Sequence, residues 1–280
     1  MKSKTFFHYL LCLIIVALYS ACGSPTTEDE TVIDSTPFIK QTKNTIIQKI
    51  FSSIPSQSET MRVLDGAGAK YNPTLLNPIE NISNYSSVKA RAINLGVYGI
   101  DLGVTSLFDQ TQESMLYLRC TNKLATSLGI SGSFDESMTS RISANSDNKD
   151  SLLAIILESY RNADSFLQEN GQAEVSSLMV AGGWIEGLYI SIQIANTTNN
   201  EAIIARITEE KTTLDNLISL LESYKKTNGG TADILISLNE LQSIYEESIP
   251  SDNKTTTKLT PEQFKKIANK STEIRNKIIQ

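Results

Sequence analysis

Three acidic residues that lie within apolar sequence are the groups of this chain best suited to chemistry. Asp101, Asp164 and Glu186 stand where burial would raise the pKa of a carboxyl group. Two such acids on either side of a cleft can hydrolyse a glycosidic bond, one as the acid and the other as the base or nucleophile. A carboxylate-based glycan hydrolase is therefore one hypothesis. The neighbours are Tyr98 for Asp101, Tyr160 and Phe166 for Asp164, and Trp184 and Tyr189 for Glu186.

The same acids suit a structural role. A buried carboxylate needs a charged or hydrogen-bonding partner, and such pairs can fix how glycine-rich helices meet. Nothing in the sequence places two of these acids on one cleft, so the structural interpretation of Asp101 and Glu186 is favoured over catalysis. The expected partners are tyrosine hydroxyls or the guanidinium groups of Arg91, Arg119 and Arg161.

A ligand platform is a third interpretation of the same region. Tyr98, Trp184 and Tyr189 could stack on a sugar or another small ligand, and with Asp101 and Glu186 they form a candidate buried polar or ligand site. Large aromatic side chains also fill protein cores, and this simpler role explains the same residues. The sequence therefore names the site without settling its purpose.

The remaining composition excludes several kinds of site. His8 is the only histidine, and Cys12, Cys22 and Cys120 are the only cysteines, so a Ser-His pair or a His- or Cys-based zinc site is not expected. Neither a phosphate-binding GxxxxGK[ST] loop nor a dinucleotide fingerprint is present. With a net charge of −6 and no basic run, we expect no nucleic-acid partner. No metal or cofactor is predicted, and a non-catalytic protein is favoured over an enzyme.

The element that must position Glu186 is the apolar stretch Val175 to Ala195, VSSLMVAGGWIEGLYISIQIA. Glu186 is its single charged residue, and Gly182, Gly183 and Gly187 would let neighbouring helices approach closely. A helix apolar on nearly every face belongs at the centre of a bundle. A membrane span is the alternative, but the serines, the glycines and the central carboxylate oppose it.

Helical periodicity runs through most of the remaining chain, and alternating strand patterns are absent. The prediction is an all-α fold, a single bundle of about eight or nine helices, with an array of stacked helical pairs as the alternative. Ser133 with Glu136, and Thr198 with Glu201, are spaced as capping boxes. The expected helices cover 39–54, 56–66, 88–108 and 112–128, then a short one from the Ser133 cap to 142, followed by 150–169 and 175–195. Further helices run from the Thr198 cap to the Gly229-Gly230 break and around 234–245, and a last one is opened by Thr260, Pro261 and Gln263.

One stretch lacks helical period. Residues 66–85, GAGAKYNPTLLNPIENISNY, are punctuated by prolines. Structureless segments of this length within a domain are often functional. The favoured interpretation is a loop that packs Leu75, Leu76 and Ile79 over one end of the bundle.

The first residues have the pattern of a secretory signal. Lys2 and Lys4 precede an apolar run, and Ser20-Ala21 forms a small-residue site before Cys22. YSAC at 19–22 resembles the lipobox of bacterial lipoproteins, with Tyr19 where that family usually has Leu. The resemblance implies a signal peptide at 1–21, cleavage before Cys22, and acylation of Cys22 with diacylglycerol and a further chain such as palmitate.

After this cleavage, we expect residues 22–38 to form a flexible acidic tether and residues 39–280 to form a single all-α domain. The signal together with GGWIEGLY at 182–189 resembles uncharacterised helical lipoproteins of the Bacteroidota. The resemblance implies an outer-membrane, lipid-anchored protein facing the periplasm or the cell surface. Its expected partners are the membrane, through the anchor, and an envelope protein or a small ligand.

Overall fold

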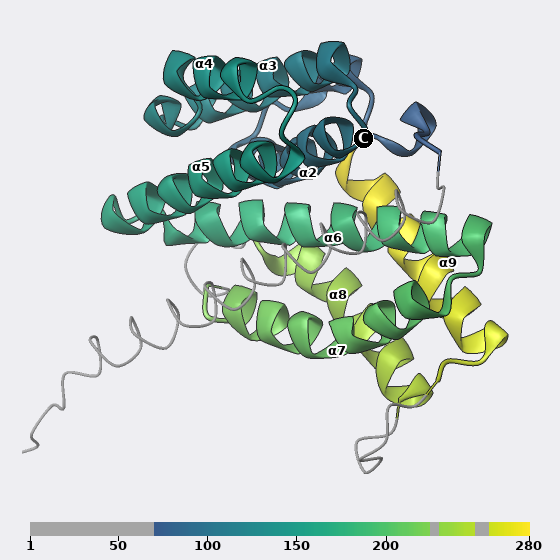
Figure 1. The fold of residues 1–280 in the computed structure, drawn as a ribbon. Coiled ribbons are helices and arrows are strands. Elements are labelled where there is room, and N and C mark those ends of the chain that lie inside the picture. The colour runs from purple at the N-terminus through teal and green to yellow at the C-terminus, as the bar shows by residue number, and fades with distance from the viewer. Residues whose placement is uncertain (1–69, 225–229, 250–257) are drawn as a thin grey trace, which may run out of the picture. The chain divides into compact units, whose positions relative to one another are not determined.

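The computed structural model describes residues 70–224, 230–249 and 258–280. The predicted signal peptide, Cys22, the tether, and the expected helices at 39–54 and 56–66 lie outside these residues. Within them the protein has eight α-helices, three short 3-10 helices and no strand, which confirms the all-α prediction (Figure 1). The α-helices are α2 (Val88–Leu107), α3 (Thr111–Ser127), α4 (Glu136–Ala144), α5 (Lys149–Glu169), α6 (Ala173–Thr198), α7 (Glu201–Glu222), α8 (Ala232–Ser248) and α9 (Pro261–Ile278).

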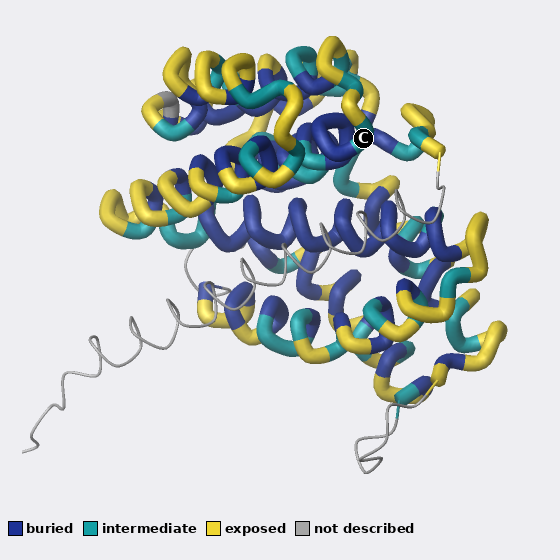
Figure 2. The backbone as a smooth tube through the Cα atoms, viewed as in Figure 1, coloured by how far each residue is buried: buried dark blue, intermediate teal, exposed yellow. Residues whose placement is uncertain are grey.

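Helix α6 is the centre of the bundle. Helices α2, α5, α7 and α9 all pack against it, and its backbone is buried along most of its length (Figure 2). By length and composition α6 could cross a membrane, and it is the one such helix among the described residues. Of its most apolar window, 83% is buried inside the protein. The structure therefore supports the core-helix interpretation of this stretch.

Two glycines bring α2 and α6 into backbone contact. A Cβ atom on Gly96 would lie 2.0 Å from the carbonyl oxygen of Met179, and a Cβ on Gly182 would lie 1.9 Å from that of Ile93. Any larger residue would force the two helices apart. This contact explains why glycines occur inside helices, where they otherwise weaken the structure.

Local sequence determines most helix starts, although two predicted caps are wrong. Thr260 and Gln263 form the expected capping box of α9. Helix α4, however, is capped by Asp135 rather than Ser133, because the Asp135 carboxylate accepts hydrogen bonds from two first-turn N–H groups. Helix α6 continues through Thr198, so Asn200 caps α7 instead.

The proline-punctuated segment is more ordered than the sequence predicts. It contains the 3-10 helices η1 (Pro73–Leu75) and η2 (Ile79–Asn84), which pack beside α2 and α3. Leu76 is buried, as expected, and so is the polar residue Asn77. The segment therefore supplies both apolar cover and hydrogen-bonding groups to the interior.

Candidate functional site

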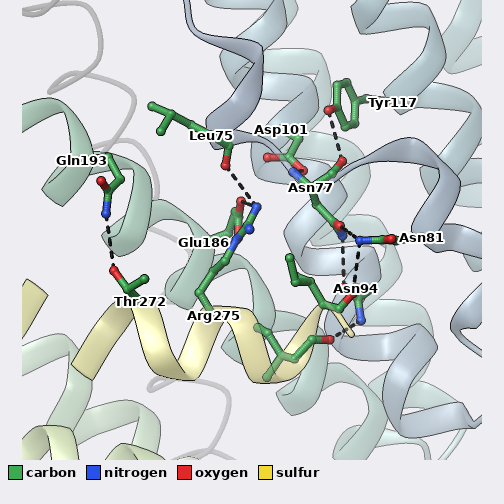
Figure 3. Close-up of polar contacts among 12 residues, drawn as sticks. Leu75, Asn77, Asn81, Asn94, Asp101, Tyr117, Glu186, Gln193, Thr272 and Arg275 are labelled. Carbon is green, nitrogen blue, oxygen red and sulfur yellow. Dashed lines mark hydrogen bonds and ion pairs between the residues drawn. The ribbon is translucent and has the colours of Figure 1, made fainter. Parts of the chain in front are cut away.

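Glu186 forms a buried salt bridge with Arg275 of the last helix. The Arg275 Nε and Nη2 atoms donate to the two oxygens of Glu186, each at 3.0 Å (Figure 3). The Glu186 side chain is fully buried and that of Arg275 is 6% exposed. The Tyr189 ring lies 4.7 Å from the guanidinium carbon and adds a cation–π contact. This two-pronged geometry satisfies both charges and ties α9 to α6.

The cation that meets Glu186 is not one that the sequence indicated. Arg119 and Arg161 are exposed, and Arg91 donates from Nε to the Tyr85 carbonyl oxygen. The prediction of these partners was wrong because Arg275 lies 89 residues along the chain from Glu186, on a different helix. A further bond from Arg275 Nη2 to the Leu75 carbonyl, at 3.0 Å, brings the segment before α2 into the same site.

Asp101 lies beside this ion pair, at the centre of α2. Its side chain is fully buried, and its Oδ2 atom accepts a hydrogen bond from the Asn77 N–H at 3.2 Å. No described N–H or O–H donor reaches Oδ1. Burial raises the pKa of Asp101 well above its ordinary value, and the neighbouring Glu186 carboxylate raises it further, against the lowering effect of Arg275.

These contacts assign one proton to the acid pair. One guanidinium can compensate one carboxylate, and two like charges in a buried site do not both ionise. Burial raises the pKa of Glu186 as well, but Arg275 and the neighbouring Asp101 lower it. We therefore expect Glu186 to be the charged member and Asp101 the protonated one. A proton on Oδ1 of Asp101 fits an oxygen to which no described group donates a hydrogen bond.

A network of amide and tyrosine side chains lies around the acids and forms hydrogen bonds with the carbonyl groups at the end of α9. The Asn94 Nδ2 atom donates to the Ile278 carbonyl at 2.8 Å, and the Tyr85 hydroxyl donates to the Ile279 carbonyl at 3.1 Å. The last carbonyls of a helix have no partner within the helix, so these bonds stabilise its terminus. Asn77, Asn81 and Tyr117 complete the network through Asn77 Nδ2 to Tyr85, Asn81 Nδ2 to Asn77 Oδ1, and the Tyr117 hydroxyl to the Asn77 carbonyl.

The other predicted site residues lie elsewhere or act as core. Trp184 is buried and donates from Nε1 to Glu210 at 2.8 Å, not to the acid pair. Asp164 bonds to Ser176, which lies roughly 15 Å along α6 from Glu186. Tyr98 is buried, and its hydroxyl donates to the Pro78 carbonyl. The structure thus joins Asp101, Glu186 and Tyr189 to Arg275 and separates Asp164 and Trp184 from them.

Asn77 and Arg275 are the site residues that sequence reasoning missed. A polar residue between two short apolar runs in a proline-rich segment looks exposed, and no local pattern distinguishes Asn77 from Asn72. For Arg275 a weak signal exists, since it falls among the apolar positions Ile267, Ala268, Ser271 and Ile274 of α9, all of which are buried.

The arrangement is suited to holding helices together. Both acids are fully buried, so neither presents its carboxyl group at the surface. Burial raises the pKa of the Cys120 thiol to about 11, which makes it a poor nucleophile. Among the described residues no group of acids, histidines and cysteines could hold a metal ion. The chain matches no protein-family model, no curated protein and no solved structure.

Proposed function

We propose that this protein is a lipid-anchored component of the cell envelope that acts by binding or assembly rather than by catalysis. The observation that carries the non-catalytic part is the complete burial of Asp101 and Glu186, together with the salt bridge that Glu186 forms with Arg275. A glycosidase needs its two acids at opposite sides of a substrate, with access for water. Here Glu186 is bound to Arg275 instead, and Asp101 is buried beside that pair.

The anchoring part of the proposal rests on the lipobox-like YSAC at residues 19–22 and on the polar tether behind it. A cysteine acylated with three chains would hold the protein firmly at a membrane, because each buried methylene contributes about 0.8 kcal/mol. On this proposal the helical bundle is presented from the outer membrane, toward the periplasm or the cell surface. There it would meet an envelope protein or a small ligand.

Mass spectrometry of protein extracted from its native membrane tests the anchor. The expected N-terminal residue is an acylated Cys22. The Cys22→Ser variant should leave the membrane fraction, whereas Cys120→Ser, which keeps Cys22, should remain in it. An unmodified and soluble wild-type protein would refute the proposal.

The non-catalytic part has its own test. Purified protein should release no reducing sugar from envelope glycans, and Glu186→Gln should behave as wild type does. Hydrolysis that wild type performs and Glu186→Gln does not would contradict this part and leave the anchor untouched.

A further inference from the structure

An open cavity of about 230 Å³ lies away from the acid pair. It forms where the C-terminal ends of α2 and α4 meet the first turns of α3 and α5. None of the residues that line it belongs to the Asp101–Glu186–Arg275 site. Its volume is many times the roughly 30 Å³ that one water molecule takes up in the liquid, so it could admit a small organic molecule.

Part of the cavity lining carries hydroxyl groups that form few hydrogen bonds within the protein. Ser106 and Ser114 are only 3% and 4% exposed. The Ser114 hydroxyl donates to the Gln110 carbonyl at 3.0 Å, but the Ser106 hydroxyl has a single long bond, 3.4 Å, to Ser114. A hydroxyl can donate once and accept twice, so most of the capacity of Ser106 is unspent. Buried polar groups normally form hydrogen bonds, and a molecule in the cavity could accept or donate at this hydroxyl.

The rest of the lining is partly apolar and partly hydroxylated. Met115, Ile142 and Leu152 supply the apolar surface. Further hydroxyl groups come from Thr111, Ser143 and Ser146. A ligand that fits this lining must combine an apolar face with several hydroxyl groups at its edge.

Charge restricts the ligand further. Asp109 is the one charged residue of the lining, and its Oδ2 atom lies 3.1 Å from the ammonium group of Lys149. Its charge is therefore already compensated, and the cavity offers nothing further that would attract a cation or an anion. The chemistry selects a neutral molecule.

We propose that this cavity binds one pyranose ring of a neutral saccharide, with a C–H face against Met115, Ile142 and Leu152 and with ring hydroxyls bonded to Ser106, Ser114 and the rim. The inference deepens the proposed binding role, on which it rests, but it does not depend on the lipid anchor. Few charged groups and no aromatic platform take part, so millimolar affinity is expected.

Methionine methyl groups offer a direct test in the full chain. With 13C-labelled methionine, titration with methyl glucoside, methyl galactoside, methyl mannoside and methyl N-acetylglucosaminide should shift the Met115 methyl signal saturably for at least one probe. Met138 and Met179 are buried outside the cavity lining and should not move. Absence of a saturable Met115 shift with all four probes, or equal shifts of Met115, Met138 and Met179, would overturn the proposal.

A matched pair of variants on α4 checks the location. Ser143→Phe fills the mouth of the cavity and should reduce the Met115 response at least tenfold. Ser140→Phe places the same side chain on the same helix at an exposed position outside the lining, and it should leave the response unchanged. Equal responses in both variants would place binding elsewhere and refute the assignment. If the titration fails although mass spectrometry shows an acylated Cys22, the saccharide proposal is refuted and the lipid-anchor proposal stands.

Discussion

Asp101 and Glu186 lie at matching places on two glycine-rich, buried helices, yet their carboxyl groups have different partners. Glu186 receives both arms of the Arg275 guanidinium and remains charged. Asp101, one helix away, accepts a hydrogen bond from a single backbone N–H, and its pKa is raised well above the ordinary value by burial and by Glu186. The difference arises from the third helix, α9, which brings one cation to a site that holds two acids.

The comparison shows how an all-α bundle can specify a single arrangement of its last helix. Apolar contacts between helices tolerate sliding, whereas an arginine with two fixed hydrogen bonds to one carboxylate does not. Asp101 lies beside this pair on α2, and we expect it to be protonated and therefore to add no charge. Loss of the Arg275 cation, of the close contact between α2 and α6, or of the Asp101 proton should therefore change the stability of the protein in separable ways.

Loss of the cation is expected to have the largest effect. Arg275→Ala leaves Glu186 buried without a partner and releases the Leu75 carbonyl. Breaking a buried ion pair from one side destabilises by about 3–5 kcal/mol. Glu186→Ala should cost a comparable amount because it strands Arg275, and Glu186→Gln should cost less because its amide retains some hydrogen bonds. Urea denaturation of the three variants beside wild type measures the free energies of unfolding.

An exposed ion pair provides the control for this prediction. Lys258 and Glu201 form a salt bridge in which both side chains are mostly exposed. Lys258→Ala should leave stability almost unchanged, because solvent screens such pairs. If Arg275→Ala were as stable as Lys258→Ala, the structural role of the buried pair would be wrong.

The sequence predicts the helices that carry Asp101, Glu186 and Arg275 better than it predicts which residues these side chains contact. Helical periodicity and the Thr260–Gln263 box are local, so the helices and the start of α9 follow from a few neighbouring residues. The apolar run around Glu186 likewise predicts a buried helix. The two wrong caps, Ser133 and Thr198, belong to stretches in which several residues could cap, and the choice depends on where packing ends the preceding turn.

The ion pair could not be predicted because its members meet only after packing. Glu186 and Arg275 are 89 positions apart, and the chain between them forms two further helices. Charge alone gives 25 basic candidates for the partner of Glu186. Asn77 is equally invisible, because its burial results from η1 and η2 folding over α2, not from its own neighbours.

The close contact between α2 and α6 gives the second prediction. In Gly182→Ala the new methyl group would overlap the Ile93 carbonyl, and the helices must separate. Overpacking of this kind costs about 1–3 kcal/mol. Thermal unfolding should show a lower midpoint, together with a weaker coupling between Asp101 and Glu186.

Gly103 is the matched control for this substitution. A Cβ there would lie 3.8 Å from the Leu153 side chain, an ordinary contact. Because alanine favours the helix, Gly103→Ala should stabilise by about 0.5–1 kcal/mol. Equal destabilisation by both variants would show that helix separation is not the cause.

The third prediction concerns the proton of Asp101, whose loss should have the most selective effect on stability. An acid whose pKa is raised by folding contributes stability below its unfolded pKa, and this contribution is lost as pH rises toward the folded pKa. Asp101 has such a raised pKa. Asp101→Asn imitates the neutral acid, because its amide can donate to Glu186 as the hydroxyl does, but it has no proton to lose.

The variant should therefore match wild type near pH 4 and become the more stable of the two as pH increases. The largest possible slope is about 1.4 kcal/mol per pH unit, the value for one proton held only by the folded state. Urea denaturation at several pH values from 4 to 8 measures this difference. Asp109→Asn, which changes an exposed carboxyl, should show no comparable divergence. Parallel curves for wild type and Asp101→Asn would mean that Asp101 is ionised in the folded protein, and the two acids would then be alike.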